Sequence, residues 1–169
     1  MKTLYVMRHA KSSWADADLA DFDRPLNDRG YRDAPFMGNV MRENGYAPDV
    51  ILSSPAVRAR ETSRLAIGGG DLDGELMFDD RIYEASPQTL RQVVSKIDDK
   101  NNSAMIVGHN PGVEGFIRFL TGTLEPMPTA ALAVIELNIE SWSDIAANSG
   151  KLIKTIRPKD ELRSLGKSN

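Results

Sequence analysis

The sequence predicts a single α/β domain, a three-layer α/β/α sandwich around a mostly parallel central sheet. Three short and almost continuously apolar segments support this prediction, at residues 3–7 (TLYVM), 49–52 (DVIL) and 104–107 (AMIV). Apolar runs of this length without polar alternation are typical of strands that are buried on both faces, as in a parallel sheet covered by helices. Helical patterns separate the three segments, and this alternation favours an α/β fold.

Four helices are predicted from their starts and their apolar periodicity. The first runs from Asn27, a candidate N-cap, to Glu43. A kink or break is expected in it at Pro35, because proline cannot donate the backbone hydrogen bond of a helix interior. The other three begin at prolines, which suit the first helical turn, and cover residues 54–67, 86–97 and 111–122.

Two later apolar runs, residues 131–139 and 151–156, are predicted strands joined by a polar connection. Residues 68–75 (GGGDLDGE) are expected to form a glycine-rich surface loop. They lack the GK[ST] ending of a P-loop. The domain is expected to span residues 1–158, followed by a polar and loosely ordered C-terminal tail at residues 159–169.

The composition excludes several classes of function. The chain has 169 residues, with 41% hydrophobic and 27% charged residues, as expected for a soluble globular domain. Its formal net charge of −3 gives no electrostatic reason to expect nucleic acid or a membrane as a partner. The absence of cysteine excludes disulfides, thiolate zinc sites and cysteine nucleophiles. Because charged residues interrupt the apolar N-terminal stretch, we expect no signal peptide and a cytoplasmic protein.

Basic side chains follow each of the three buried segments. Arg8 and His9 come after the first, Arg58 follows the second, and His109 follows the third; the two histidines are the only ones in the chain. In open α/β sheets, ligands bind in the crevice outside the carboxyl ends of the strands. The two helices that follow the second and third segments begin at the same end and add positive dipole ends. The sequence therefore predicts an anion site.

The predicted anion is phosphate. Arginine presents a rigid fork of donors that matches phosphate oxygens bidentately. With no acidic metal cluster in these three loops, the arginines themselves would neutralise the charge of phosphoryl transfer, and we expect neither a metal nor another cofactor. A histidine between them can attack phosphorus and form a phosphohistidine that water hydrolyses. Neighbouring cations favour its neutral, nucleophilic form.

The residues alone leave other interpretations open. A single histidine after a strand is more often structural than catalytic. His9 and His109, together with an aspartate, could instead ligate zinc, although the adjacent Arg8 would repel a divalent cation. Arg58 could also be an ordinary surface residue of its helix.

Five ordered motifs resemble the histidine phosphatase superfamily, whose fold is phosphoglycerate-mutase-like. Together they look like its small SixA-type phosphohistidine phosphatase branch, and the resemblance extends from Met1 to about Gly122. The motifs are MRHAKSSW (7–14), DRPLNDRG (23–30), SSPAVRARET (53–62), RIYEAS (81–86) and VGHNPG (107–112).

The resemblance implies a role for each of five residues. His9 would be the phosphorylated nucleophile, and Arg8 and Arg58 would bind the phosphoryl group. His109 would be the second pocket histidine, which stabilises the transferring oxygens. Glu84 falls where other members carry the acid that protonates the leaving group.

Glu84 and three further residues keep two interpretations, and one position departs from the family. Glu84 is either the acid or a solvated loop residue. Lys11 and Ser12 either hydrogen-bond to the phosphate or face water. Trp14 either contacts substrate at the rim of the pocket or anchors its loop by packing. Ala10 stands where the family usually has glycine, which allows a tighter backbone turn.

We therefore predict a metal-independent phosphatase with a histidine nucleophile and a covalent phosphohistidine intermediate. Because the chain lacks the long insertion with which mutase members enclose a sugar phosphate, its expected substrate is phosphohistidine on a protein. One alternative is a phosphatase of small phosphomonoesters, such as sugar phosphates or nucleotides. Another is a non-catalytic module that binds phosphorylated partners.

Overall fold

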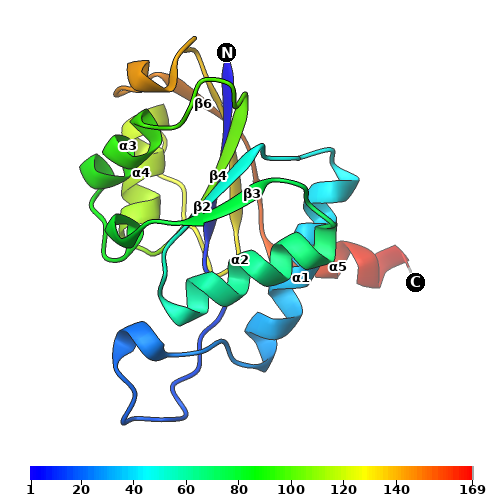
Figure 1. Cartoon of the computed structure of the whole chain (residues 1–169). Coiled ribbons are helices and arrows are strands. Elements are labelled where there is room, and N and C mark those ends of the chain that lie inside the picture. The colour runs from blue at the N-terminus through cyan, green and yellow to red at the C-terminus, as the bar shows by residue number, and fades with distance from the viewer. Residues whose placement is uncertain (169) are drawn as a thin grey trace.

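A six-stranded sheet with the strand order β3-β2-β4-β1-β5-β6 forms the centre of the computed structural model, which describes residues 1–168 (Figure 1). Neighbouring strands among β1–β4 pair in parallel, whereas β5 runs antiparallel to both β1 and β6. The strands are β1 (Lys2–Arg8), β2 (Val50–Ser53), β3 (Glu75–Phe78), β4 (Ser103–Gly108), β5 (Leu132–Leu137) and β6 (Gly150–Ile156).

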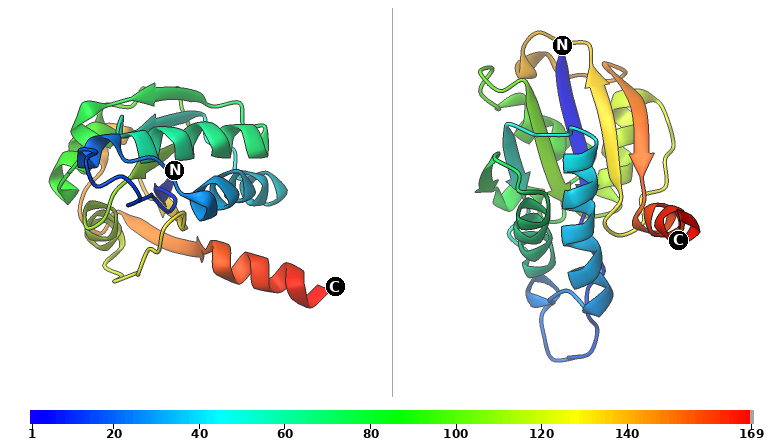
Figure 2. Two further views of the ribbon diagram at one scale, coloured as in Figure 1. Left: turned by 90° about the horizontal axis from the view of Figure 1, so that it is seen from below. Right: turned by 90° about the vertical axis from the view of Figure 1, so that its right-hand side faces the viewer.

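Helices cover both faces of this sheet and confirm the predicted three-layer α/β/α sandwich. The pair α1 and α2 lies on one face, and the pair α3 and α4 lies on the other (Figures 1 and 2). The helices are α1 (Asp28–Glu43), α2 (Val57–Gly70), α3 (Pro87–Ser95), α4 (Gly112–Thr121) and α5 (Pro158–Ser168). None of the helices within residues 1–168 is long and apolar enough to cross a bilayer.

The central strand β1 shows why the apolar runs have no alternation. Leu4 and Val6 pack into the apolar cluster beneath α3 and α4. Tyr5 and Met7 pack into the cluster beneath α1 and α2. Since successive side chains of a strand point to opposite faces, a strand between two cores must be apolar at every position.

The expected break in α1 at Pro35 and the expected start of a loop at residue 68 are both wrong, and the packing of α1 against α2 explains why. Pro35 does not interrupt α1, and Gly69 and Gly70, expected in a loop, belong to the last turn of α2. A Cβ atom at Gly38 would lie 1.9 Å from the carbonyl oxygen of Ala66, and one at Gly69 would lie 2.1 Å from that of Pro35. The glycines therefore allow two helix backbones to touch. This contact stabilises the helical conformation of α1 at Pro35 and of α2 at its C-terminal glycines.

The structure adds one strand and one helix that the sequence did not predict. Strand β3 pairs with β2 at the edge of the sheet, and three of its four residues are exposed, so it lacks the signal of a buried strand. The C-terminal segment, expected to be a loosely ordered tail, forms α5 over residues 158–168. The division into a domain at 1–158 and a separate tail stays a prediction.

Candidate active site

The sheet brings the predicted site residues to one edge. Strand β4 lies between β1 and β2, and its Gly108 is in register with Arg8 of β1. The backbone N–H of His9 donates a hydrogen bond to the carbonyl oxygen of Gly108 at 3.0 Å. As a result, the rings of His9 and His109 are tilted against each other with their centroids 5.1 Å apart. Residues from the first and third predicted strands thus meet, as expected from their parallel order.

His9 is held in one tautomer and in its neutral form. Its side chain is buried, and Nδ1 lies 2.7 Å from the carbonyl oxygen of Ala10. Because a carbonyl oxygen can only accept, Nδ1 carries the proton and the lone pair is on Nε2. The pKa of His9 is lowered to about 3, mainly by burial and also by His109, Arg58 and Arg8, against the opposing effect of the Ala10 hydrogen bond. Near pH 7, the ring is therefore neutral and Nε2 carries a free lone pair.

Ala10 fits its position without the properties of glycine. Its side chain is fully buried in the apolar cluster beneath α1 and α2. Its N–H donates to Oγ1 of Thr62 at 2.9 Å, and that hydroxyl donates to the carbonyl oxygen of Arg58 at 2.6 Å. Ala10 is not among the non-glycine residues with positive φ in the described part of the chain. The backbone after His9 thus follows a path that an L-residue adopts freely.

Two guanidinium groups stand beside the histidine pair. The Nη1 atom of Arg8 donates to the carbonyl oxygen of Met127 at 3.1 Å. Arg58 is buried and donates twice to Asp21, from Nη1 to the backbone oxygen at 2.7 Å and from Nη2 to Oδ2 at 3.0 Å. The Nε atoms of Arg8 and Arg58 are buried and have no hydrogen-bond partner.

His109 is oriented by a serine and a tyrosine. Its Nε2 lies 2.7 Å from Oγ of Ser54, and the ring of Tyr83 packs edge-on against it at 5.5 Å between centroids. Burial lowers the pKa of His109 to about 4, and repulsion from Arg58 adds to this effect. Its Nδ1 is buried without a partner, as are the two arginine Nε atoms. Among the side chains described, those of residues 1–166, only one other buried nitrogen or oxygen, Oγ1 of Thr155, lacks a partner, so unpaired groups gather at this site.

The sequence did not single out Asp21 and Tyr83 for the site. The carboxylate of Asp21 accepts from the Tyr83 hydroxyl at 2.7 Å, from Arg58 and from Arg24. The Tyr83 hydrogen bond is the main cause that lowers the pKa of Asp21 to about 2, and both arginines add to it. Burial and this same hydrogen bond raise the pKa of Tyr83 to about 12. In the sequence, Tyr83 lies inside the motif RIYEAS, and Asp21 lies two residues before the motif DRPLNDRG. No other sequence signal pointed to this pair.

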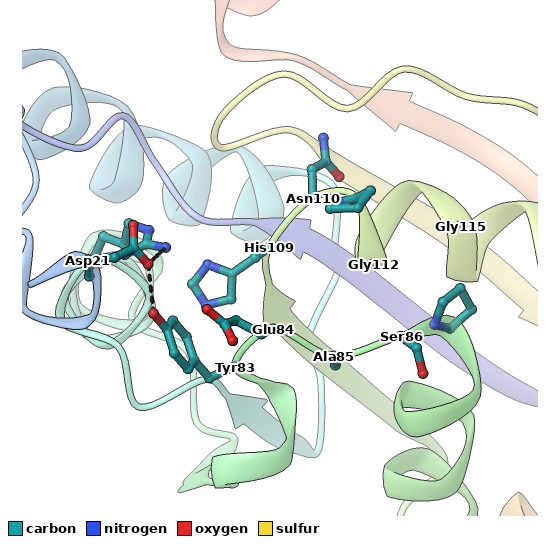
Figure 3. A pocket seen from close by; sticks show the side chains of 12 residues that line it. Asp21, Tyr83, Glu84, Ala85, Ser86, His109, Asn110, Gly112 and Gly115 are labelled. Atoms are coloured by element: carbon teal, nitrogen blue, oxygen red, sulfur yellow. Dashed lines mark hydrogen bonds and ion pairs between the residues drawn. The ribbon is translucent and has the colours of Figure 1, made fainter.

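A cleft of about 810 Å³ opens beside these residues. Tyr83, Glu84 and His109 lie around the same opening (Figure 3). The Glu84 backbone is left-handed, with a φ of 56°, a conformation that is uncommon for non-glycine residues. Of the predicted residues, Arg58, His109 and Glu84 line the cleft, whereas the remaining four, Arg8, His9, Lys11 and Ser12, do not.

The hydrogen bonds of Lys11 and Ser12 connect the loop after β1 to neighbouring segments, and their contact with phosphate stays a prediction. The backbone oxygen of Lys11 accepts from the N–H of Asn27 at 3.0 Å. The Oγ of Ser12 is buried and accepts from Nη1 of Arg24 at 2.7 Å. Both residues therefore shape the loop after the first strand. Among residues 1–168, no three histidine, aspartate or glutamate side chains are grouped so that they could hold a metal ion.

Comparison with known proteins identifies the family. The family model of the histidine phosphatase superfamily (branch 1) matches residues 4–92. The uncharacterised protein MT1313 of Mycobacterium tuberculosis is 34% identical over 158 residues, which cover 87% of this chain and 96% of that protein. The family model covers the ends of β1 and β2, with Arg8, His9 and Arg58, and stops before β4 and His109.

Solved structures share the whole fold. A protein from Agrobacterium tumefaciens, assigned as the phosphohistidine phosphatase SixA, aligns with a TM-score of 0.80 and 29% identity over 93% of this chain and 98% of that chain. Mycobacterial glucosyl-3-phosphoglycerate phosphatase aligns with a TM-score of 0.68 and 14% identity over 90% of this chain and 97% of that chain. At 14% identity, the match to the glucosyl-3-phosphoglycerate phosphatase shows only that the two proteins share a fold.

The fold and these matches define an enzyme of the phosphatase or mutase type. The chain belongs to the histidine phosphatase superfamily, and within it to the SixA-type branch.

Proposed function

We propose that this protein is a phosphatase that uses His9 as its nucleophile and removes the phosphoryl group of phosphohistidine on a protein. The observation that supports this most strongly is the state of His9. It is a buried, neutral imidazole whose Nδ1 proton is fixed on Ala10, so that Nε2 is available beside Arg8 and Arg58.

Two displacements at phosphorus complete the reaction. In the first, Nε2 of His9 attacks, a new P–N bond forms, and the P–N bond to the substrate imidazole breaks, with its electron pair leaving on that imidazole. In the second, water attacks the phosphoryl group on His9. Inorganic phosphate leaves, and the electron pair of the broken bond returns to Nε2. Both steps use the same in-line geometry.

The cationic residues stabilise the charge that develops on the phosphoryl oxygens. Arg8 and Arg58 each present a buried Nε–H that no protein atom satisfies. If the Ser54 hydroxyl donates to Nε2 of neutral His109, Nδ1 of that ring carries a proton and is a third unpaired donor. A phosphoryl group accepts from all three, and such preorganised donors stabilise a transition state most effectively in a site that excludes water.

Glu84 is the proposed proton donor to the leaving group. Its left-handed backbone holds it at the cleft, and its side chain is exposed. An imidazole leaves far more readily than an alkoxide, so phosphohistidine cleavage needs this proton less than phosphomonoester cleavage does. Glu84→Gln is therefore expected to slow a sugar phosphate about 100-fold or more and phosphohistidine less than 10-fold.

A phosphatase of small phosphomonoesters is the second candidate. The cleft volume of about 810 Å³ is large enough for a sugar phosphate or a nucleotide, and the same fold occurs in an enzyme named for a glucosyl phosphoglycerate substrate. The cleft is nevertheless open, and an open cleft suits a phosphoryl group carried on a protein better than a small substrate that must be enclosed. The expectation of a cytoplasmic protein that binds neither nucleic acid nor membrane stays a prediction.

A substrate panel tests the proposal. Wild type and His9→Ala would be assayed with phosphohistidine on a protein, a set of sugar phosphates and an aryl phosphate, each with and without EDTA. We expect the highest kcat/KM with phosphohistidine, no effect of EDTA and no turnover by His9→Ala. Comparable rates with many sugar phosphates and none with phosphohistidine would instead support the second candidate. Phosphate binding without turnover of any substrate would indicate a binding module.

A further inference from the structure

A loop beside the cleft carries exposed apolar side chains that no catalytic step uses. This loop, residues 13–24, is called the rim arm here. It projects beyond the end of the sheet at which the parallel strands finish (Figures 1 and 2). Every residue from 14 to 21 is exposed, including Trp14 at 71% and Leu19 at 39%. A tryptophan in water on a projecting loop is typical of a protein contact site.

Trp14 has a fixed position relative to the phosphate-binding residues. Its ring stacks on the guanidinium of Arg24, whose Cζ lies 3.5 Å from the ring centroid. Arg24 is buried and donates to Asp21 at 3.2 Å, and Asp21 in turn accepts from Arg58 at 3.0 Å. One face of the indole is therefore covered by Arg24. The hydrogen bonds from Arg24 to Asp21 and from Arg58 to Asp21 continue this connection to the cleft.

The rim arm also forms part of the cleft wall. Phe22 packs edge-on against Tyr83, with ring centroids 5.1 Å apart. Tyr83 and Asp21 both line the cleft. A molecule that rests on the rim arm is thus directly beside the opening that leads to His109.

The exposed side of the rim arm is acidic. Residues 13–24 contain four aspartates and one arginine, which gives a formal charge of −3 in this short segment. Asp21 is engaged by Arg58, whereas Asp16, Asp18 and Asp23 are exposed. Acidic side chains around an aromatic anchor complement a basic surface with an apolar pocket.

We propose that the rim arm docks the protein that carries the phosphoryl group, through a basic surface around its phosphohistidine, with Trp14 as the anchor. This inference rests on the proposed function, since it assumes a phosphoprotein substrate. The aspartates attract the basic surface, Trp14 enters its apolar part, and the rigid connection through Arg24 presents the phosphohistidine to the cleft. Because Trp14 does not line the cleft, we expect free phosphohistidine to react without using it.

The test compares two substrates that share one chemical bond. The first is a small basic protein that has been phosphorylated on histidine with phosphoramidate, and the second is free phosphohistidine. The variants are Trp14→Ala and the double variant Asp16→Asn with Asp18→Asn. Leu124→Ala is the matched control, because Leu124 is also 71% exposed but lies outside the rim arm.

We expect both rim-arm variants to lower kcat/KM for the phosphoprotein at least 10-fold and to leave kcat/KM for free phosphohistidine within 2-fold. Leu124→Ala should change neither value. The effect of the aspartates should also disappear at high salt, because screening removes their attraction. Equal losses with both substrates, or no loss with either, would overturn the proposal.

Two outcomes separate this inference from its premise. If wild type hydrolyses an aryl phosphate but neither form of phosphohistidine, the proposed function fails and the docking role falls with it. If wild type forms a concentration-dependent dimer that Trp14→Ala abolishes, a second copy occupies the rim arm, and the proposed partner is wrong. Size-exclusion chromatography of both proteins over a range of concentrations provides this measurement.

Discussion

Lowering the pH from 7 to 5 should destabilise this protein through its two active-site histidines. The folded state lowers the pKa of His9 to about 3 and that of His109 to about 4. An unfolded histidine has a pKa of about 6.5. As the pH falls below 6.5, the unfolded chain therefore binds protons that the folded protein does not, and the free energy of unfolding decreases.

The magnitude follows from these values. At pH 7 both rings are largely neutral in both states and contribute almost nothing. At pH 5 each ring favours the unfolded state by about 2 kcal/mol, so the pair lowers the free energy of unfolding by about 4 kcal/mol. Asp21 acts in a separate range, because its pKa of about 2 contributes stability that is lost only as the pH falls below about 4.

Urea unfolding at pH 7 and pH 5 measures this effect, and His9→Asn is the informative variant. Asparagine can still donate to the Ala10 carbonyl oxygen from the position of Nδ1, but it does not titrate. We expect wild type to lose about 4 kcal/mol and His9→Asn about 2 kcal/mol over this interval. An equal loss in both proteins, or a wild-type loss below about 1 kcal/mol, would refute the assignment of a buried neutral His9.

Two other variants test the site and the fold. Asp21→Asn removes the negative charge beside Arg58, so the inhibition constant of inorganic phosphate at pH 7 should fall about 5-fold; an unchanged or higher constant would mean that Asp21 does not oppose anion binding. Gly38→Ala should lower the free energy of unfolding in urea by about 3 kcal/mol, because the new Cβ would overlap the Ala66 carbonyl oxygen. Gly68→Ala, whose Cβ would meet no atom within 4 Å, should be neutral or stabilise the same protein by up to about 1 kcal/mol, and similar losses in both variants would contradict this account of the helix contact.

The sequence predicted the fold well wherever burial alone decides the structure. Strands β1, β2 and β4 are buried on both faces, so their apolar runs were visible in the sequence. Strand β3 was missed because most of its residues are exposed at the sheet edge. Pro35 was expected to kink or break α1, because proline is unfavourable inside a helix, but α1 continues through it in close contact with α2.

The site was predictable to the extent that strand order places residues together. His9 and His109 follow neighbouring parallel strands, so their proximity follows from topology. The Asp21–Tyr83 hydrogen bond joins two loops that are 62 residues apart, and no strand register relates them. The hydrogen bond from Arg24 to Ser12 is of the same kind: it joins two loop positions 12 residues apart that no strand register relates.

The central claim, that His9 carries the phosphoryl group, is tested most directly by trapping it. Wild type would be mixed with radiolabelled phosphohistidine, quenched within milliseconds in base and digested, and the labelled peptide would be sequenced by mass spectrometry. We expect one acid-labile, base-stable label on His9 and none in His9→Asn. A label on another residue, or labelling that persists in His9→Asn, would contradict the claim.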